Sequence, residues 1–364
     1  MLLHYGLKLK GNSHEALGLE CQDAFSIRSV GDRLLVAAIA DGLGSCSRSA
    51  VGARLAAESA TAYLAGHLSS GCLCADVLPE LEAAFREALQ QVKVAAGGED
   101  LLDYSSTFTI VVYDGEHLAY GHVGDSGAIA LTPAGDYQLI TRQMKGALAN
   151  ETVPLSYGEK YWRFGYEPGP FCAIALMTDG LYEHICLPSL REKTPPLYGA
   201  RVRPFIDRAV APINTQEEAE EMGQEILTYF QTEPEARGTN DDLTLVCLFN
   251  QAIVPAEKEP DYYVPQITAD EALNYQRRLY PSLEAKTSTT TDGQDSQECA
   301  NESVAVIQRT TDPLAEGFSA LETLDAYSSQ WSMIEWAFLI ALIALAGFFS
   351  LVVIVIFMAI VFHL

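Results

Sequence analysis

Two aspartates in this chain follow apolar strands in the same way. Asp41 comes directly after the run LLVAAIA and Asp179 follows AIALMT, and a glycine follows each of them. An Asp-Gly pair is usually an ordinary turn, and the pairs at 114–115 and 292–293 fit that interpretation. A strand that is apolar on both faces, however, is a buried central strand, so the carboxylate that ends it lies at the edge of a packed sheet. Asp41 and Asp179 are therefore candidates for chemistry rather than for turns alone.

Further aspartates stand beside other predicted strands. Asp241 and Asp242 precede LTLVCLF, Asp125 follows HLAYGHVG, and Asp23 stands at the entry of another strand. Buried strands that end in carboxylates gather negative charge at one sheet edge, and such a group does not stay fully ionised without cations. Ligand sets made only of oxygen atoms suit Mg²⁺ or Mn²⁺. Each aspartate alone indicates little, but the set predicts a divalent-metal site.

The elements that position these residues form one domain over residues 1–250. Strands are predicted where apolar residues alternate or run together, at Leu2–Leu9, Asp23–Ser29, Arg33–Ala40, Phe108–Tyr113, His117–Val123, Gly127–Leu131, Tyr137–Thr141, Phe171–Met177 and Leu243–Phe249. Helical patterns cover Ser49–Leu68, Val77–Ala95, with Asp76 as its N-cap, and the region near Gln216–Phe230. Short connections such as Asp114-Gly115 indicate mainly antiparallel pairing. We therefore expect sheets with helices packed outside them.

Charge and cysteine usage narrow the class of protein. The formal net charge of −25 argues against nucleic acid as a main partner, because phosphate backbones favour Lys and Arg patches. The start MLLHYGLKLKGNSHE is too polar for the apolar segment of a signal peptide. The eight cysteines are scattered through apolar stretches rather than spaced as a framework, which fits the reduced thiols of a cytoplasmic protein.

A composition change after residue 250 predicts a linker over residues 251–335. This segment is acidic, and it includes the Ser/Thr-rich stretch EAKTSTTTDGQDSQECANES, which is almost free of large apolar side chains. Such a composition is typical of a flexible tether. The four tyrosines within residues 256–283 leave open whether part of the segment docks on the domain.

The C-terminal region predicts a single transmembrane helix over residues 336–362. Ala337–Phe362 holds no charged residue, and as a helix it would be about 39 Å long against a hydrocarbon core of about 30 Å. Trp331 and Trp336 stand where an interfacial belt belongs. We expect a tail anchor, with the preceding domain facing the cytoplasm.

The order and spacing of six short segments resemble the metal-dependent serine/threonine protein phosphatases of the 2C type. The segments are GLECQDAF, VAAIADGLGS, YSSTFT, YGHVGDSGAI, LMTDGLYE and TNDDLTLV. The resemblance covers roughly residues 5–250 and is closest to the bacterial subgroup. It implies an α+β fold of two packed antiparallel β-sheets flanked by α-helices, an αββα sandwich, and this agrees with the strand pattern above.

Carried over by position, the resemblance implies a two-metal site for Mn²⁺ or Mg²⁺. Asp41 would bridge the two ions, and the Gly42 carbonyl would bind one of them. Asp179 and Asp241 would complete the sphere of the other ion. Asp23 matches the family's first-motif aspartate beside the metals and is implied as a further metal ligand. Asp41, Asp23 and Asp179 are the implied catalytic residues.

Asp125, together with Glu183, matches positions that the family links to a third, weaker metal. The implied activity is hydrolysis of phosphoserine and phosphothreonine in proteins by a water that bridges two metal ions. The implied partners are a phosphoprotein substrate and, because of the membrane anchor, a membrane-associated Ser/Thr kinase or its client.

Two departures from the family pattern leave an alternative open. Gly18 stands where many members carry an Arg that grips phosphate, and Leu43 stands where some carry a His. His14 or Arg33 could compensate for the missing Arg. The alternative is a catalytically weak or inactive phosphatase-fold module that binds phosphoproteins or a membrane partner.

Two polar features near these motifs have structural interpretations. His122 is expected to be a half-buried strand histidine with a hydrogen-bond partner. Ser105-Ser106-Thr107 matches a small-residue strand start in the family and is expected to pack under the site rather than to act as a nucleophile.

Overall fold

The strands form two five-stranded sheets that pack face to face. The computed structural model describes residues 1–69, 73–145, 152–233 and 239–264. The first sheet has the order β1-β10-β9-β6-β7 and the second has the order β2-β3-β4-β5-β8. Every neighbouring pair is antiparallel. The bounds are β1 Leu2–Leu9, β2 Ala24–Val30, β3 Leu34–Ala40, β4 Phe108–Tyr113, β5 His117–Val123, β6 Gly127–Leu131, β7 Tyr137–Leu139, β8 Arg163–Pro168, β9 Ala173–Met177 and β10 Leu243–Asn250.

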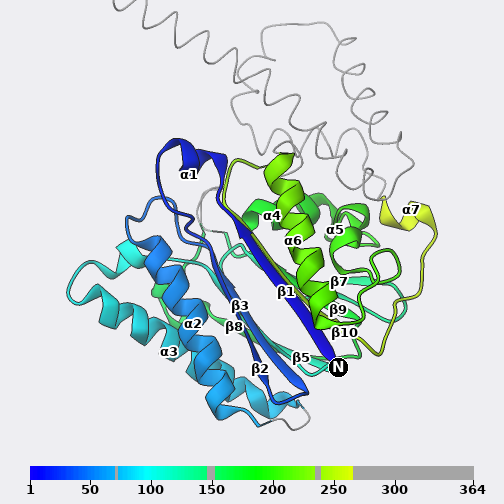
Figure 1. The fold of residues 1–364 in the computed structure, drawn as a ribbon. Helices are drawn as coiled ribbons and strands as arrows, with labels where there is room; N and C mark the ends of the chain where they lie inside the picture. Colours follow the sequence, from blue (N-terminus) through cyan, green and yellow to red (C-terminus); the bar gives the residue numbers. More distant parts are fainter. Residues whose placement is uncertain (70–72, 146–151, 234–238, 265–364) are drawn as a thin grey trace, which may run out of the picture.

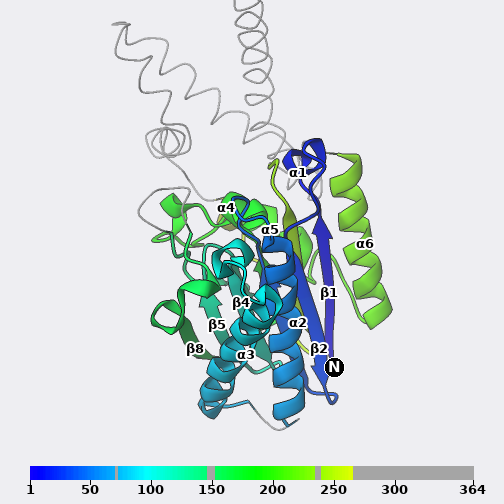
Figure 2. The same cartoon turned by 90° about the vertical axis from the view of Figure 1, so that its left-hand side faces the viewer.

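Helices cover the outer face of each sheet. In Figures 1 and 2, α2 and α3 lie against the second sheet, and α4, α5 and α6 lie on the side of the first sheet. The helices of the described residues are α1 Asn12–Ala16, α2 Ser49–His67, α3 Leu78–Ala96, α4 Asp179–Ile185, α5 Gly199–Ile206, α6 Gln216–Thr232 and α7 Pro260–Tyr263. The expected arrangement of two packed antiparallel sheets with flanking helices is confirmed.

Strand β3 shows why a continuous apolar run forms a central strand here. All seven of its residues are buried. Successive side chains point to opposite faces of a strand, so alternate residues of β3 belong to two different cores. One set packs in the layer with α2 and α3 and the other packs between the sheets. The first set is Leu34, Val36, Ala38 and Ala40, and the second is Leu35, Ala37 and Ile39.

Several local predictions are wrong at the level of single elements. Asp76 is not the N-cap of α3, because it lies inside a short 3₁₀ turn, Ala75–Val77, and the cap of α3 is Val77. Strand β8 was not predicted, since its sequence RFGYEP is mostly half-buried and carries no clear alternation. The short helices α1 and α4 were also missed, because five and seven residues span too few turns for a periodic pattern.

The chain stays packed on the domain beyond β10. The backbone N–H of Tyr137 donates to the Tyr262 hydroxyl at 3.1 Å, and the Arg203 guanidinium lies 4.0 Å from the centre of the Tyr263 ring. The start of the predicted linker therefore docks through Val264. The rest of that linker and the transmembrane segment predicted over residues 336–362 lie outside the described residues. Within the described part of the chain, no helix is long and apolar enough to cross a bilayer.

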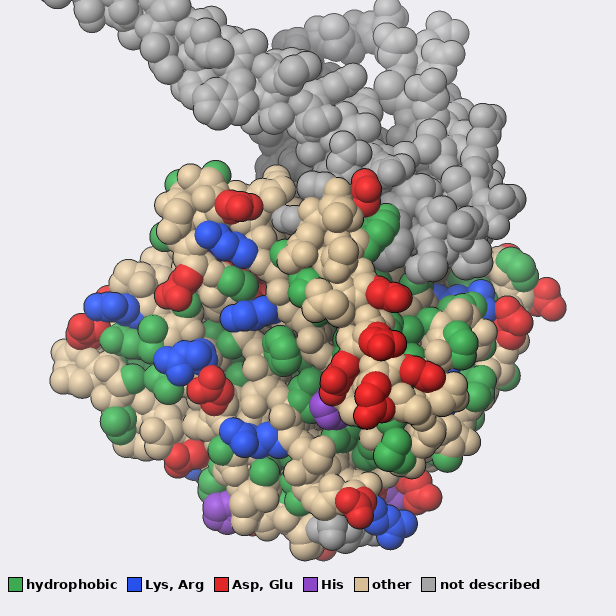
Figure 3. Space-filling model, viewed as in Figure 1, with side chains coloured by type: hydrophobic (Ala, Val, Ile, Leu, Met, Phe, Trp, Pro, Cys, Tyr) green, Lys and Arg blue, Asp and Glu red, His purple; other side chains and the backbone are tan. Residues whose placement is uncertain are grey.

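Negative charge is concentrated on the exposed face of α6. Figure 3 shows acidic side chains gathered over this helix. Its sequence, QEEAEEMGQEILTYFQT, places its buried residues on one side and most of its glutamates toward solvent. The glutamates are Glu217, Glu218, Glu220, Glu221 and Glu225. This face is a solvated acidic surface of an amphipathic helix.

Candidate metal centre

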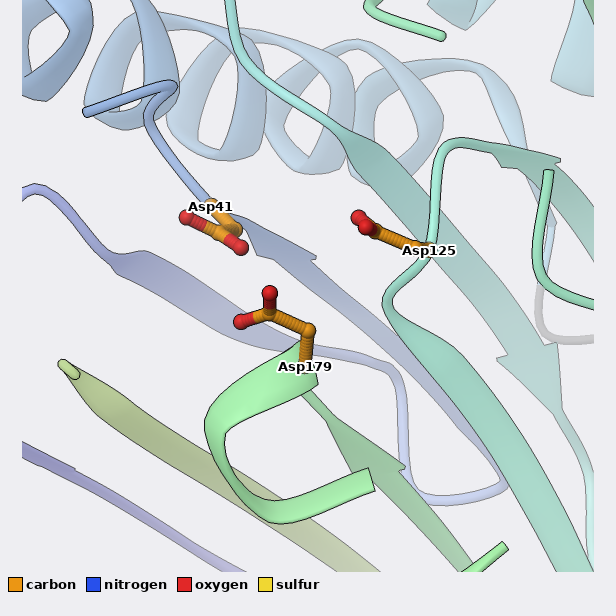
Figure 4. Close-up of side chains that lie close together, drawn as sticks. All are labelled: Asp41, Asp125 and Asp179. Carbon is orange, nitrogen blue, oxygen red and sulfur yellow. The ribbon is translucent and has the colours of Figure 1, made fainter. Parts of the chain in front are cut away.

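Three carboxylates from different elements meet where the two sheets end. Asp41 follows β3, Asp125 lies in the turn between β5 and β6, and Asp179 opens α4 directly after β9. Each offers an oxygen, and these oxygens all lie within 4.8 Å of one another. Figure 4 shows the carboxyl groups pointing toward a shared space. The second sheet supplies Asp41 and the first sheet supplies Asp179, so the site depends on the packing of both.

Hydrogen bonds to Thr107 fix the position of Asp41. The Asp41 backbone N–H donates to the Thr107 hydroxyl at 3.0 Å, and the Thr107 N–H donates to the Asp41 carbonyl at 2.8 Å. The Thr107 hydroxyl also lies 2.9 Å from the Ser126 hydroxyl, next to Asp125. Thr107, in the segment Ser105-Ser106-Thr107, therefore holds the backbone of the site, and the expected structural role of this segment is confirmed.

Glycines follow Asp41 and Asp179 because other backbone segments approach closely there. A Cβ atom at Gly42 would lie 2.8 Å from the Gln22 carbonyl oxygen. A Cβ atom at Gly180 would lie 2.2 Å from the Asp242 carbonyl oxygen. Within the described residues, no hydrogen bond reaches the Gly42 carbonyl oxygen. The two Asp-Gly pairs are thus points of close contact, not surface turns, and the Gly42 carbonyl stays a predicted metal ligand.

The environment of Asp41 and Asp179 opposes their ionisation. Burial raises the pKa of Asp41 well above its usual range, and the charges of Asp179, Asp23 and Asp125 add to the effect. Burial likewise raises the pKa of Asp179 to about 7, with contributions from Asp125 and Asp241. Among the described residues, other buried carboxylates such as Asp125 form an ion pair with a basic side chain, whereas Asp41 and Asp179 do not. Oxygen ligands that lack a protein cation fit divalent metal ions.

Asp23 lies beside this group but has different contacts. Its Oδ2 accepts hydrogen bonds from the hydroxyls of Thr178 at 2.8 Å and Thr244 at 2.7 Å. Its Oδ1 is buried and has no hydrogen-bond partner. Burial raises the pKa of Asp23, and the charges of Asp242 and Asp179 raise it further. Asp23 is not a member of the three-carboxylate group, so its role as a metal ligand stays a prediction.

The neighbours Asp241 and Asp242 have opposite surroundings. Asp241 is exposed and lies outside the three-carboxylate group, although its charge raises the pKa of Asp179. Asp242 is buried and accepts the backbone N–H groups of Gly11 at 2.7 Å and Gln22 at 2.5 Å. The resemblance assigns the metal to Asp241, whereas Asp242 holds the N-terminal segment in place.

A lysine that the sequence analysis missed lies at the position expected for a third metal. The Lys145 ammonium nitrogen is 3.3 Å from Asp125 Oδ2 and also forms an ion pair with Glu183 Oε1. Burial lowers the pKa of Lys145, but the hydrogen bond to Glu183 and the charges of Asp125 and Glu183 outweigh burial and raise it. Asp125 and Glu183 thus come together as predicted, with a protein cation between them.

The groups proposed to replace the missing Arg do not do so. His14 is buried with its Nδ1 2.9 Å from Asp242 Oδ2, and Arg33 precedes β3 at the end opposite to Asp41. Gly18 is exposed in the left-handed region with φ of 67°, a backbone conformation that an Arg side chain would strain. No residue at these three positions reaches the three-carboxylate group.

His122 is a structural residue. It is more deeply buried than expected, at 2% exposure, and its two ring nitrogens lie 2.9 Å from the Thr109 hydroxyl and 3.0 Å from the Arg142 carbonyl oxygen. Burial lowers its pKa to about 4. It therefore stays neutral near pH 7, and the expected hydrogen-bonded role is confirmed.

The sequence matches the model of a known family over residues 10–228, and the family is described as protein phosphatase 2C. Because this match spans more than half of the chain, the chain belongs to the protein phosphatase 2C family, and it is a protein phosphatase by that membership. Among curated proteins, none matches the sequence significantly.

Solved structures of bacterial phosphatases are similar to this fold. A bacterial serine phosphatase is 12% identical with a TM-score of 0.50, and the match covers 71% of this chain and 100% of that chain. The serine/threonine phosphatase of S. agalactiae is 12% identical with a TM-score of 0.50, covering 68% of this chain and 99% of that one. The PstP catalytic domain, solved in complex with two manganese ions, is 19% identical with a TM-score of 0.46, covering 68% and 97%. The first two establish a shared fold.

Proposed function

We propose that this protein hydrolyses phosphoserine and phosphothreonine in other proteins with two Mn²⁺ or Mg²⁺ ions. Asp41, Asp179, Asp241 and the Gly42 carbonyl would hold the ions. The observation that carries the proposal is the meeting of Asp41, Asp125 and Asp179 within 4.8 Å, with no protein cation paired to Asp41 or Asp179 in the described residues. Membership of the protein phosphatase 2C family supports the reaction.

Residues around the carboxylates hold the predicted metal ligands in place. Bound divalent cations lower the pKa of water and offset the negative charge of the phosphoryl oxygens. Thr107 holds Asp41 through both its backbone N–H and its backbone carbonyl, so the point where its side chain leaves the backbone is fixed. Asp23 accepts a hydrogen bond from the hydroxyl of Thr178, the residue before Asp179, and so anchors it. The groups of a preorganised site do not have to reorient during the reaction. This preorganisation is the main source of electrostatic catalysis.

The test compares EDTA with added Mn²⁺ on the full protein, using p-nitrophenyl phosphate and a phosphothreonine peptide. Asp41→Ala and Asp179→Asn are assayed beside it, and Lys160→Gln serves as a control at an exposed position whose ammonium lies over the Tyr161 ring. We expect turnover that needs Mn²⁺, is lost in both aspartate variants and is unchanged in the control. A folded protein that binds Mn²⁺ but turns over neither substrate would favour the phosphoprotein-binding module instead.

We also propose that residues 336–362 attach the phosphatase to the cytoplasmic face of a membrane. The support is the uncharged apolar run Ala337–Phe362 and the tryptophans at its N-terminal side. Tethering would raise the effective concentration of membrane substrates, so a membrane-associated Ser/Thr kinase or its client is the partner class we propose. The protein should sediment with membranes and resist carbonate extraction. Release of the intact protein by carbonate would contradict the attachment.

A further inference from the structure

The third acidic position of this site already holds a cation from the protein itself. Lys145 Nζ lies 3.3 Å from Asp125 Oδ2 and pairs with Glu183 Oε1. Asp125 and Glu183 come from different elements, the β5–β6 turn and α4, so the ammonium group joins that turn to that helix. The side chains of Lys145 and Glu183 are 33% and 31% exposed, whereas that of Asp125 is 8% exposed. The contact with Asp125 is therefore the partly desolvated half of the pair.

The backbone around Lys145 is held to the turn that carries Asp125. The Met144 N–H donates to the Gly124 carbonyl at 2.6 Å, and the Gln143 side-chain amide donates to the Asp125 carbonyl at 3.0 Å. Lys145 also forms an isolated antiparallel bridge with Thr152. These contacts fix the start of the lysine side chain beside its acidic partners.

The charges at this position favour the Lys145 ammonium group over a divalent metal ion. One ammonium group offsets half of the charge of Asp125 and Glu183 and supplies donors to both carboxylates. A divalent ion between the same oxygens would lie within about 4 Å of the ammonium group, where like charges repel by several kcal/mol at a partly buried site. A third metal could enter only after the lysine had moved away.

We propose that Lys145 takes the place of a third metal ion between Asp125 and Glu183, so that this phosphatase binds two metal ions and one internal ammonium group. The proposal deepens the proposed function and rests on it only for the two ions at Asp41 and Asp179. It also identifies Lys145 as a positioning residue, because its ammonium group holds the Asp125 carboxylate at the edge of the metal site.

The experiment counts bound Mn²⁺ by equilibrium dialysis of the full protein over a range of free Mn²⁺ concentrations. Lys145→Gln removes the ammonium group, Lys145→Arg keeps a positive charge, and Lys160→Gln removes an exposed lysine elsewhere. Weak Mn²⁺ binding to the acidic face of α6 (Figure 3) is common to all four proteins and cancels in the differences. Circular dichroism confirms that each variant is folded.

We expect two tightly bound ions in the wild type, Lys145→Arg and Lys160→Gln, and a third, weaker ion in Lys145→Gln. The double variant Lys145→Gln/Glu183→Gln should return to two, because the third site has then lost one of its carboxylates. Three ions in the wild type, or no gain in Lys145→Gln, would overturn the proposal while leaving the two-metal site intact. Zero bound ions in the wild type would instead contradict the proposed function.

Discussion

Asp242 lies near the three-carboxylate group in this molecule, but its hydrogen-bond partners are of a different kind. Asp242 is surrounded by donors, since the N–H groups of Gly11 and Gln22 point at its two oxygens. Asp41 and Asp179 face each other and Asp125 instead. All of these carboxylates lie beside the same strand ends. Backbone N–H groups donate to both oxygens of Asp242, whereas the nearest groups to Asp41 and Asp179 are other carboxylates.

The comparison indicates how a structural carboxylate can be told from a functional one. A buried carboxylate that accepts two or three N–H bonds is stabilised as an anion and ties segments together. A carboxylate whose neighbours are other carboxylates destabilises the metal-free fold through charge repulsion. Such repulsion is typical of a functional site, where a bound cation relieves it. By this criterion Asp242 is structural, whereas Asp41 and Asp179 belong to a cation site.

The largest expected effect is on turnover. Asp41→Asn or Asp179→Asn should lower Mn²⁺-dependent hydrolysis by more than about 10³-fold, because each removes a ligand charge that the metals need. In the absence of metal, each variant should be no less stable than the wild type, since a charge that its neighbouring carboxylates repel is lost. Steady-state kinetics and urea unfolding measure the two effects, and a variant that loses stability in parallel with turnover would break the comparison.

The neighbours Asp241 and Asp242 should show opposite phenotypes. Asp242→Ala leaves the N–H groups of Gly11 and Gln22 without acceptors and should lower the free energy of unfolding by about 3 kcal/mol. Asp241→Ala, at an exposed position, should change stability by less than about 0.5 kcal/mol while weakening Mn²⁺-dependent turnover. Urea unfolding and kinetics on both variants decide the matter. Equal losses of stability would show that the two carboxylates are equivalent.

The metal-free protein should become less stable as the pH rises from about 5 to 8. Burial raises the pKa of Asp179 to about 7 and that of Asp41 well above its usual range, so the folded state binds more protons than the unfolded chain across this window. The free energy of unfolding should therefore fall with pH, by on the order of 2 kcal/mol in total. Saturating Mn²⁺ should remove most of this slope. A metal-free stability that rises over the same window would contradict the repulsion.

Asp23→Asn should have only a small effect on the fold. The carboxamide oxygen can still accept from Thr178 and Thr244, so we expect a change of less than about 1 kcal/mol in the free energy of unfolding. Loss of the negative charge beside Asp41 should weaken Mn²⁺ binding by about tenfold. Asp23→Ala is the sharper comparison, because both hydroxyls lose their acceptor. Equal stability of the Asn and Ala variants would show that these hydrogen bonds contribute little.

Much of the fold is predictable because its central strands are buried on both faces. The run from Leu34 to Ala40 and the strand after Asp242 have unmistakable apolar patterns, and both are strands in the structure. Strand β8 is half-buried and α4 has only seven residues, so neither carries a clear period. The Asp76 cap failed because the chain turns in a 3₁₀ conformation before α3 begins.

The candidate site was less predictable than the strands around it. The positions of Asp41 and Asp179 follow from the strands that they end. The sequence does not distinguish the exposed Asp241 from the buried Asp242, because their difference comes from the N-terminal segment that packs against Asp242. Lys145 was missed for a similar reason: it reaches Asp125 only because residues 143–145 fold back on the β5–β6 turn.

The most direct test of the central claim is turnover of a phosphothreonine peptide against Mn²⁺ concentration in three proteins: wild type, Asp41→Asn and Asp242→Asn. It is run at a temperature where all three are folded by circular dichroism. The account predicts that Asp242→Asn keeps wild-type turnover per folded molecule, whereas Asp41→Asn has none above background at any Mn²⁺ concentration. Wild-type turnover by Asp41→Asn would contradict the assignment of the metal centre.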